Sequence, residues 1–331
     1  MTHQFAIIGN GSWSSALVKI LNDNGHHVHW WMRSKEAIDH LQRKHHNPHY
    51  LTSVNYDMKL ITLFDDPEAC IKQSDMILIG IPSAFIINTI GSLPADIFQD
   101  KKILSAIKGI LPDHHVLLNE YLETAFNVSI QDYCCIAGPC HAEEIAAEKL
   151  SYLTFASLNS ELADTIANHF SNHYLQTVLS NDVYGVQYAA VLKNIYALGA
   201  GIAHGLDYGD NFLSVYITNC FAELQHFMDV ISTQTQHHYN TSVYLGDLLV
   251  TCYSLHSRNR TFGNFIGKGY SVNATKLELN MVAEGYYASK GIYEICKKIS
   301  YDLPVANCIY NILWKHQPAR TAFSEIEKIC H

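Results

Sequence analysis

The feature that most constrains this chain lies near its start, where a short apolar run meets a glycine-bearing turn. Residues 5–8 read Phe-Ala-Ile-Ile, and Gly9, Asn10 and Gly11 follow them. Residues 16–21 then have the composition of a helix. Because the first amides of a helix are unpaired and its dipole favours negative charge, a turn of this kind is suited to bind anions. The pattern therefore predicts a dinucleotide-binding turn of the Rossmann type.

The two glycines of this turn have distinct expected roles. Gly9 permits the tight turn, and Gly11 lets the backbone approach a pyrophosphate closely. The third position of the G-x-G-x-x-G/A fingerprint is Ser14, so the match is imperfect. The alternative is a glycine-bearing turn between a strand and a helix in another kind of α/β protein. The place of the turn, after an apolar run and before a helix, favours the dinucleotide site.

Apolar runs alternate with helical stretches over the first half of the chain. Further strands are expected at residues 26–32, 59–64, 75–83, 101–106, 133–137, 152–156 and 174–179. No convincing strand pattern follows residue 182. The sequence therefore predicts an α/β fold in two domains. Residues 1–181 form a dinucleotide-binding Rossmann domain with a doubly wound, mostly parallel sheet, and residues 182–331 form an all-helical substrate and catalytic domain.

Composition argues against several classes of protein. The formal net charge of −9 gives no basic footprint for nucleic acid. The chain contains no run of 18 apolar residues, so no membrane span is expected. The first expected strand begins close to residue 1, so no signal peptide is expected. Nine cysteines without a C-x-x-C pair fit reduced thiols, so we expect a cytoplasmic protein.

Histidine is abundant, with 20 residues, and is densest at residues 45–49. Asn47 and Pro48 indicate a loop there, and no cysteine or carboxylate lies close by in the sequence. We expect a solvated polar loop and no metal site.

Basic residues follow two of the expected strands. Arg33 ends the strand at 26–32, where an acidic residue would hydrogen-bond the ribose 2′-hydroxyl of NAD and an arginine would accommodate the 2′-phosphate of NADP. Arg33 therefore favours NADPH. Lys108 follows the strand at 101–106 and can contact an anionic substrate or cofactor as a point charge. The alternative for each is a solvated surface side chain.

Polar residues of the helical half are gathered in a few places. Lys193 and Asn194 lie in a long helical stretch, 184–204, whose Gly199-Ala200-Gly201 allows close packing. Two further clusters are Leu245-Gly246-Asp247-Leu248-Leu249-Val250-Thr251 and Ser257-Arg258-Asn259-Arg260-Thr261-Phe262-Gly263. Asp210 is expected to cap the next helix.

Read in order, these motifs resemble those of the bacterial NAD(P)-dependent sn-glycerol-3-phosphate dehydrogenases, over nearly the whole chain. The segments that carry the resemblance are Gly9-Asn10-Gly11-Ser12-Trp13, Trp30-Trp31-Met32-Arg33, Asn47-Pro48-His49-Tyr50-Leu51, Ile81-Pro82-Ser83, Lys108-Gly109, Gly138-Pro139, Leu192-Lys193-Asn194, Gly209-Asp210-Asn211, Leu245-Gly246-Asp247-Leu248, Thr251-Cys252, Ser257-Arg258-Asn259 and Glu284-Gly285. The resemblance implies a reversible reduction of dihydroxyacetone phosphate to sn-glycerol 3-phosphate with NADPH or NADH. It also implies a cytoplasmic homodimer whose product feeds glycerophospholipid synthesis.

The resemblance assigns roles to the matching residues. Lys193 is expected to be the catalytic proton donor or acceptor. The expected substrate residues are Lys108, Gly138, Cys140, Lys193, Asn194, Asp247, Thr251, Ser257, Arg258 and Asn259. The expected cofactor residues are Gly9, Gly11, Ser12, Trp13, Arg33, Lys108, Ala142, Arg258, Val282 and Glu284. No metal is expected.

Three segments depart from the family pattern. Ser14-Ser15 stands where the family usually has Gly-Thr, and Asn219-Cys220 where Arg-Gly is common. Cys140-His141 replaces a hydroxyl residue followed by Phe, which puts the substrate contact at position 140 in question.

The residue types fit the chemistry of ketone reduction. Lys193 can supply a proton to the nascent alkoxide, and Lys108 can help to hold its negative charge. Arg258 offers a planar fork for a phosphate, and Asn259 adds a neutral donor. Asp247 can orient Lys193 or balance the cationic cluster.

Two other functions remain open from the residues. A hydroxyacid dehydrogenase with the same two-domain plan would share the glycine turn but would not need Ser257-Arg258-Asn259. A dinucleotide-binding sensor that has lost catalysis would not need Lys193.

Overall fold

The computed structural model describes residues 3–232, 236–279 and 283–330. Val282, one of the expected cofactor residues, lies outside the described residues. The chain divides into two compact units: a first unit of residues 1–107 and 118–183, and a second unit of residues 108–117 and 184–331. The expected domain boundary after residue 181 stays a prediction. The compact units differ from the expected domains chiefly because residues 108–117 belong to the second, helical unit.

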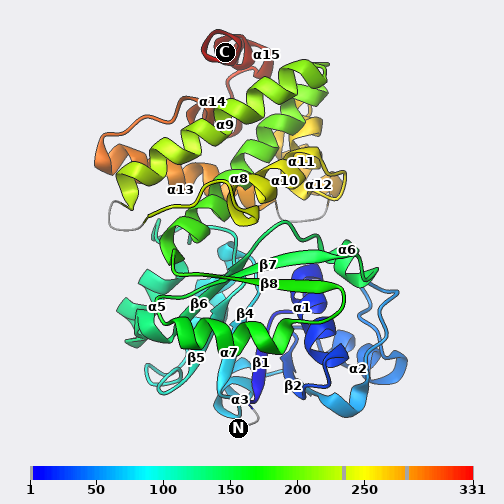
Figure 1. Ribbon diagram of the computed structural model, residues 1–331. Helices are drawn as coiled ribbons and strands as arrows, with labels where there is room; N and C mark the ends of the chain where they lie inside the picture. The colour runs from blue at the N-terminus through cyan, green and yellow to red at the C-terminus, as the bar shows by residue number, and fades with distance from the viewer. Residues whose placement is uncertain (1–2, 233–235, 280–282, 331) are drawn as a thin grey trace. The chain divides into compact units, whose positions relative to one another are not determined.

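The first unit is built on one eight-stranded sheet in the order β3-β2-β1-β4-β5-β6-β7-β8 (Figure 1). All neighbouring strands are parallel except β6 and β7, which confirms the mostly parallel Rossmann-type sheet. The strands are β1 (Phe5–Ile8), β2 (Val28–Trp31), β3 (Ile61–Phe64), β4 (Met76–Ile79), β5 (Lys102–Ser105), β6 (Tyr133–Ala137), β7 (Ser151–Ala156) and β8 (Leu175–Ser180).

The winding of the sheet reverses between β1 and β4. Both strands are buried along their whole length, as their continuous apolar runs predict. In doubly wound sheets, ligands bind at the carboxyl ends of the strands where the winding reverses. The turn after β1, at Gly9, therefore lies at the expected cofactor position.

Helices flank this sheet, and their starts follow the capping residues. Asp66 caps α3 with Pro67 in the first turn, as the sequence predicts. The strand expected at 59–64 starts only at Ile61, because Asp57 caps a short 3₁₀ turn over Met58–Leu60. The helices are α1 (Ser12–Asp23), α2 (Lys35–Lys44), α3 (Pro67–Lys72), α4 (Ile86–Ile90), α5 (Leu118–Phe126), α6 (Ala142–Ala146) and α7 (Ser160–Phe170).

The regular secondary structure in the described residues of the second unit is helical, apart from one isolated bridge between Leu111 and Val116. Its α-helices are α8 (Val183–Gly205), α9 (Asp210–Ile231), α10 (Asp247–Tyr253), α11 (Arg258–Gly267), α12 (Val272–Leu279), α13 (Glu284–Ile299), α14 (Pro304–Trp314) and α15 (Ala319–Ile329). A π-helix, Ser242–Gly246, precedes α10. The expected cap at Asp210 was wrong, since Gly209 holds the cap position and Asp210 begins α9. Among the described helices, none has the length and apolar character needed to cross a bilayer.

Glycines set the distance between α8 and α11. Gly201 and Gly205 lie four residues apart on α8, and Gly263 and Gly267 have the same spacing on α11. A Cβ at Gly201 would lie 2.0 Å from the carbonyl oxygen of Arg260, and one at Gly263 would lie 2.0 Å from that of Leu198. The two backbones therefore touch, which fixes the first turn of α11 relative to α8. The small residues noted in the sequence of α8 do allow close packing.

Candidate active site

The turn after β1 has the backbone that a dinucleotide site needs. Gly9 has φ of +130°, and a Cβ there would lie 2.9 Å from Ile81 Cγ2, so this position requires glycine. Gly11 precedes the first residue of α1 and has an ordinary φ of −71°. Apart from its chain neighbours, no described atom lies within 4 Å of a Cβ placed at Gly11. The fold itself therefore does not require glycine at position 11, whereas close approach of a pyrophosphate would.

Ser14, the departure from the glycine fingerprint, is accommodated by a glycine on the neighbouring strand. Its side chain is fully buried, and Oγ donates a hydrogen bond of 2.8 Å to the carbonyl oxygen of Gly80. A Cβ at Gly80 would lie 2.5 Å from that Oγ. Helix α1 can therefore approach the end of β4 with serine at this position because residue 80 has no side chain.

A loop that the sequence led us to expect in solvent holds the glycine turn in place. Asn47 is fully buried, and its Nδ2 donates to the carbonyl oxygen of Asn10 at 3.1 Å and to Ser15 Oγ at 3.0 Å. Its Oδ1 accepts hydrogen bonds from the amides of residues 49 and 50. Trp30 Nε1 donates to the carbonyl oxygen of Gly9 at 2.7 Å. The expectation of a solvated loop was wrong for Asn47, because its buried side chain hydrogen-bonds to the glycine turn and to the start of α1.

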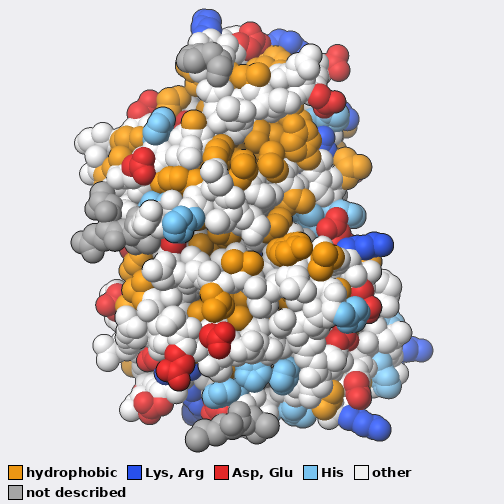
Figure 2. Space-filling view, viewed as in Figure 1, with side chains coloured by type: hydrophobic (Ala, Val, Ile, Leu, Met, Phe, Trp, Pro, Cys, Tyr) orange, Lys and Arg blue, Asp and Glu red, His pale blue; other side chains and the backbone are white. Residues whose placement is uncertain are grey.

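Histidine side chains gather elsewhere on the first unit, as the pale blue groups in Figure 2 show. The rings of His26 and His169 lie in contact, with Nε2 and Nδ1 3.3 Å apart. Burial, together with the neighbouring histidines, lowers the pKa of His169 to about 4. Within residues 3–232, 236–279 and 283–330, no group of three or more His, Cys, Asp and Glu side chains is arranged to hold a metal.

Three further expected residues of the first unit, Arg33, Gly138 and Cys140, follow β2 and β6, whereas Ser12 and Trp13 begin α1 and Ala142 begins α6. Arg33 is exposed just beyond the end of β2. Gly138 has φ of +142°, and a Cβ there would lie 2.6 Å from the carbonyl oxygen of Tyr152. Cys140 is buried, and its Sγ donates to that same oxygen at 3.0 Å. The thiol is therefore used in tying the β6–α6 turn to β7.

In the second unit, Lys193 of α8 forms a buried ion pair with Asp247, the first residue of α10. The two side chains are only 4% and 2% exposed, and the pair joins Nζ to Oδ1. Thr251 Oγ1 donates to the Asp247 carbonyl oxygen at 2.5 Å. The second carboxylate oxygen, Oδ2, is buried without any donor among the described residues. A buried anionic oxygen without a donor is costly, and a donor from a ligand would remove this cost.

A chain of side-chain amides joins three further segments of the second unit. Asn194 Nδ2 donates to the carbonyl oxygens of Lys108 and Ala190, each at 3.0 Å. Asn259 Nδ2 donates to Asn194 Oδ1 at 2.8 Å, and the Gly285 amide donates to Asn259 Oδ1 at 3.0 Å. The sequence predicted Lys108, Asn194 and Asn259 as site residues, and the structure brings them together.

The first turn of α11 carries the remaining expected substrate residues of the second unit. We use the name Lys193 cluster for Lys108, Lys193, Asn194, Asp247, Thr251, Ser257, Arg258 and Asn259. Ser257 caps the helix, its Oγ accepting a hydrogen bond of 3.3 Å from the Arg260 amide. Arg258 is the first helical residue and is partly exposed, while Asn259 is buried. A helix N-terminus with a guanidinium beside it is suited to bind a phosphate.

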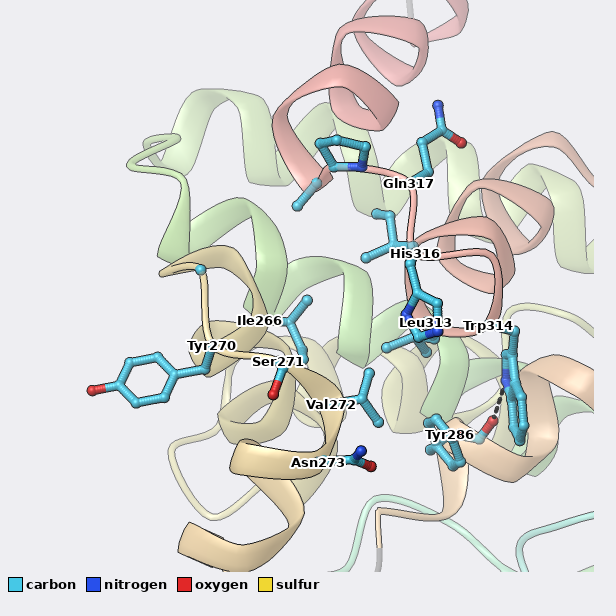
Figure 3. Close-up of a pocket in the computed structure, with 14 residues that line it drawn as sticks. Ile266, Tyr270, Ser271, Val272, Asn273, Tyr286, Leu313, Trp314, His316 and Gln317 are labelled. Carbon is cyan, nitrogen blue, oxygen red and sulfur yellow. Dashed lines mark hydrogen bonds between the residues drawn. The ribbon is translucent and has the colours of Figure 1, made fainter.

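The second unit also contains a cavity of about 610 Å³ (Figure 3). Its walls include Tyr286 of α13, Trp314 at the end of α14, and Tyr270, Val272 and His316. Trp314 Nε1 donates to the Tyr286 carbonyl oxygen at 3.2 Å. None of the described residues that the sequence assigned to the site lines this cavity. It is therefore separate from the Lys193 cluster.

Comparison with known proteins places this geometry in a family. The family model for the N-terminus of NAD-dependent glycerol-3-phosphate dehydrogenase matches residues 4–163, and the model for its C-terminus matches residues 182–324. The chain belongs to this family. It is 34% identical to the NAD(P)+ glycerol-3-phosphate dehydrogenase of Streptococcus sanguinis, over 97% of this chain and 94% of that protein. Identity to the enzyme of the same name from Latilactobacillus sakei is also 34%, over 98% and 96% of the two chains.

Solved structures agree with this membership. The crystal structure of glycerol-3-phosphate dehydrogenase from Coxiella burnetii superimposes with a TM-score of 0.91 at 26% identity, covering 98% of both chains. D-mandelate dehydrogenase in complex with NADH gives a TM-score of 0.60 at 14% identity, over 96% of this chain and 99% of the other. The second likeness shows only a shared fold. The resemblance found in the sequence is thus confirmed for the family and for the fold.

Proposed function

We propose that this member of the family reduces dihydroxyacetone phosphate to sn-glycerol 3-phosphate, reversibly, with NADPH or NADH. The observation that carries the proposal is the buried Lys193–Asp247 pair, in which Asp247 Oδ2 has no donor among the residues that the structure describes. The oxygen of a ketone must receive a proton when the ketone is reduced, and Lys193 can supply it. The hydroxyl group of dihydroxyacetone phosphate can donate a hydrogen bond to Asp247 Oδ2. We further propose that the product feeds glycerophospholipid synthesis and that the enzyme is a cytoplasmic homodimer.

Lys193 is the proposed proton donor. Its Nζ protonates the oxygen that forms as hydride reaches the ketone carbon, and its positive charge stabilises the developing alkoxide. Asp247 Oδ1 holds this ammonium group, and Oδ2 accepts a hydrogen bond from the substrate hydroxyl. Thr251 fixes the backbone of Asp247 from one turn further along α10.

The phosphate is proposed to bind at the first turn of α11. Arg258 supplies a planar fork of donors there, and the helix dipole favours the dianion. Asn259 contributes the N–H that it does not donate to Asn194. Ser257 acts mainly as the helix cap, because its Oγ already accepts the Arg260 amide. Lys108 adds a positive charge, and Gly138 and Cys140 stay proposed substrate residues.

The first unit fits a nicotinamide dinucleotide, which supplies the hydride when bound. Gly9 makes the turn. The space where a Cβ of residue 11 would lie holds no described atom, so a pyrophosphate could approach the Gly11 backbone there. Ser12 and Trp13 begin α1, and Ala142 begins α6. The cofactor roles of Arg33, Lys108, Arg258 and Glu284 also stay proposals. Residues 1–181 and 182–331 are the proposed cofactor and substrate domains.

Exchanging Arg33 for Asp is expected to raise the KM for NADPH by about tenfold or more and to leave the KM for NADH nearly unchanged. The reason is that only NADPH carries the 2′-phosphate that the guanidinium would neutralise. Steady-state kinetics with both cofactors measures the difference. Arg43→Asp is the control, because Arg43 is also exposed on the first unit but lies at the end of α2. An equal rise for NADH would remove Arg33 from the 2′-phosphate site.

Arg258→Lys is expected to lower kcat/KM for dihydroxyacetone phosphate by about 10- to 100-fold, because a lysine lacks the planar fork. With unphosphorylated dihydroxyacetone the same substitution should have little effect. The ratio of the two losses is the measurement. Comparable losses on both substrates would show that Arg258 does not bind the phosphate.

The proposed function is tested by following NADPH oxidation with dihydroxyacetone phosphate beside a panel of 2- and 3-oxoacids. A marked preference for dihydroxyacetone phosphate is expected. Preference for an oxoacid would indicate a hydroxyacid dehydrogenase. Binding of NADPH without turnover of any of these ketones would indicate a sensor.

A further inference from the structure

The side chain of Asn194 has no N–H left for a substrate. An asparagine amide carries two N–H donors and one carbonyl acceptor. Both donors of Asn194 are used inside the protein, one on the carbonyl oxygen of Lys108 and one on that of Ala190. Its Oδ1 accepts from Asn259. A direct hydrogen bond from Asn194 to a substrate oxygen would require one of these bonds to break.

The orientation of both amides is fixed by the backbone at the two ends of the chain of hydrogen bonds. At one end the Gly285 amide can only donate, so it selects Oδ1 of Asn259. At the other end two carbonyl oxygens can only accept, so they select Nδ2 of Asn194. Turning either side chain over would place donor against donor or acceptor against acceptor. The arrangement is therefore a directed bridge with a single hydrogen-bonding pattern.

The bridge joins segments that are distant in the sequence. Ala190 lies one turn back on α8, whereas Lys108 begins the segment 108–117, which precedes α8 by many residues. Gly285 lies in the first turn of α13, where a Cβ would be 2.4 Å from the Asn194 carbonyl oxygen. Only glycine at position 285 allows α13 to come this close to α8. The main chain of Lys108 is thus fastened to the helix that carries Lys193.

We propose that Asn194 is a positioning residue for Lys108 and is not a ligand of the substrate. It holds the Lys108 backbone to α8 and, through Asn259, holds both to the start of α13. This inference rests on the proposed function, in which the Lys108 ammonium group supports the negative charge of the substrate. A displacement of about 1 Å in a group of this kind can cost up to about 100-fold in rate.

A double-mutant cycle in the full-length enzyme tests the inference. The variants are Lys108→Ala, Asn194→Ala and the double variant, each assayed for kcat/KM with dihydroxyacetone phosphate and NADPH. Asn194→Ala alone is expected to lower kcat/KM by about 10- to 100-fold. In the Lys108→Ala background the same substitution should cost less than about threefold, because the side chain that it positions is already gone. A general packing defect would not vanish in that background.

Asn219→Ala is the matched control, because Asn219 of α9 also donates its amide to the carbonyl four residues back, at 2.9 Å. It should leave kcat/KM nearly unchanged. If Asn194→Ala fails to fold, Asn194→Ser repeats the cycle, because the shorter hydroxyl can still donate to the Ala190 carbonyl oxygen but has no amide for that of Lys108.

Losses that multiply in the double variant, or an Asn194→Ala enzyme of normal activity, would overturn the positioning role. A wild-type protein that does not reduce dihydroxyacetone phosphate would instead overturn the proposed function.

Discussion

Replacing Lys193 by Met is expected to cut kcat for dihydroxyacetone phosphate by about 10²- to 10⁴-fold, the usual loss for a general acid. Methionine has a similar volume, so the substitution removes the proton and the charge while largely keeping the packing. NADPH binding should be nearly intact, because the dinucleotide turn lies in the other compact unit. Turnover under saturating substrates and NADPH fluorescence titration measure the two quantities.

The buried partner of Lys193 has to be considered in this experiment. Without the ammonium group, Asp247 would be left as an unpaired buried charge, which costs about 3–5 kcal/mol of stability. Lys193→Met combined with Asp247→Asn removes that charge, and this double variant should regain stability but not turnover.

Lys19→Met controls for the loss of a buried, paired lysine elsewhere. Lys19 lies on α1 with its side chain only 8% exposed, and it pairs with Asp23 and Glu148. It should lose stability and keep kcat. Near-normal turnover in a folded Lys193→Met enzyme would contradict the proposed mechanism.

Gly263→Ala is expected to destabilise the second unit by about 3 kcal/mol or more. The new Cβ would lie 2.0 Å from the Leu198 carbonyl oxygen and 2.9 Å from the Ile202 nitrogen, so α8 and α11 would have to move apart. The higher helix propensity of alanine stabilises the helix by only about 1 kcal/mol, which does not offset the clash. Because α11 begins with Arg258 and Asn259, kcat/KM should fall as well.

Urea unfolding measures the stability change in Gly263→Ala. Gly209→Ala is the control, since a Cβ at Gly209 would meet no atom within 4 Å and its φ of −84° suits alanine. Its cost should stay near 1 kcal/mol or below, the value of a weakened helix cap. Equal stability of the Gly263 and Gly209 variants would show that the two helices can separate freely.

The sequence predicted those parts of the fold that depend on local pattern. Buried parallel strands read as continuous apolar runs, and the turn after Phe5–Ile8 has the glycines that its backbone demands. The helical character of residues after 182 followed from the loss of strand patterns. The residues of the Lys193 cluster were also predicted, because their motifs resemble those of a known family.

What the sequence did not predict depends on partners far along the chain. Ser14 departs from the glycine fingerprint, and the sequence does not show that Gly80, 66 residues away, leaves room for its side chain. Asn47 looked like a loop residue, yet its amide supports a turn 37 residues away. The Lys193–Asp247 pair and the saturated amide of Asn194 follow from helix packing, which no local pattern specifies. For Asn47, the one available signal in the sequence was that Asn47-Pro48 belongs to a motif shared with the family that the chain resembles.

The bound cofactor is expected to supply a hydride to the carbonyl carbon of dihydroxyacetone phosphate. NADPH deuterated at the transferable position of nicotinamide C4 tests this transfer most directly. After incubation with the enzyme and dihydroxyacetone phosphate, mass spectrometry of the products measures the label. The expected product is sn-glycerol 3-phosphate with one deuterium, located at C2. Unlabelled glycerol 3-phosphate, or no glycerol 3-phosphate at all while NADPH is consumed, would contradict it.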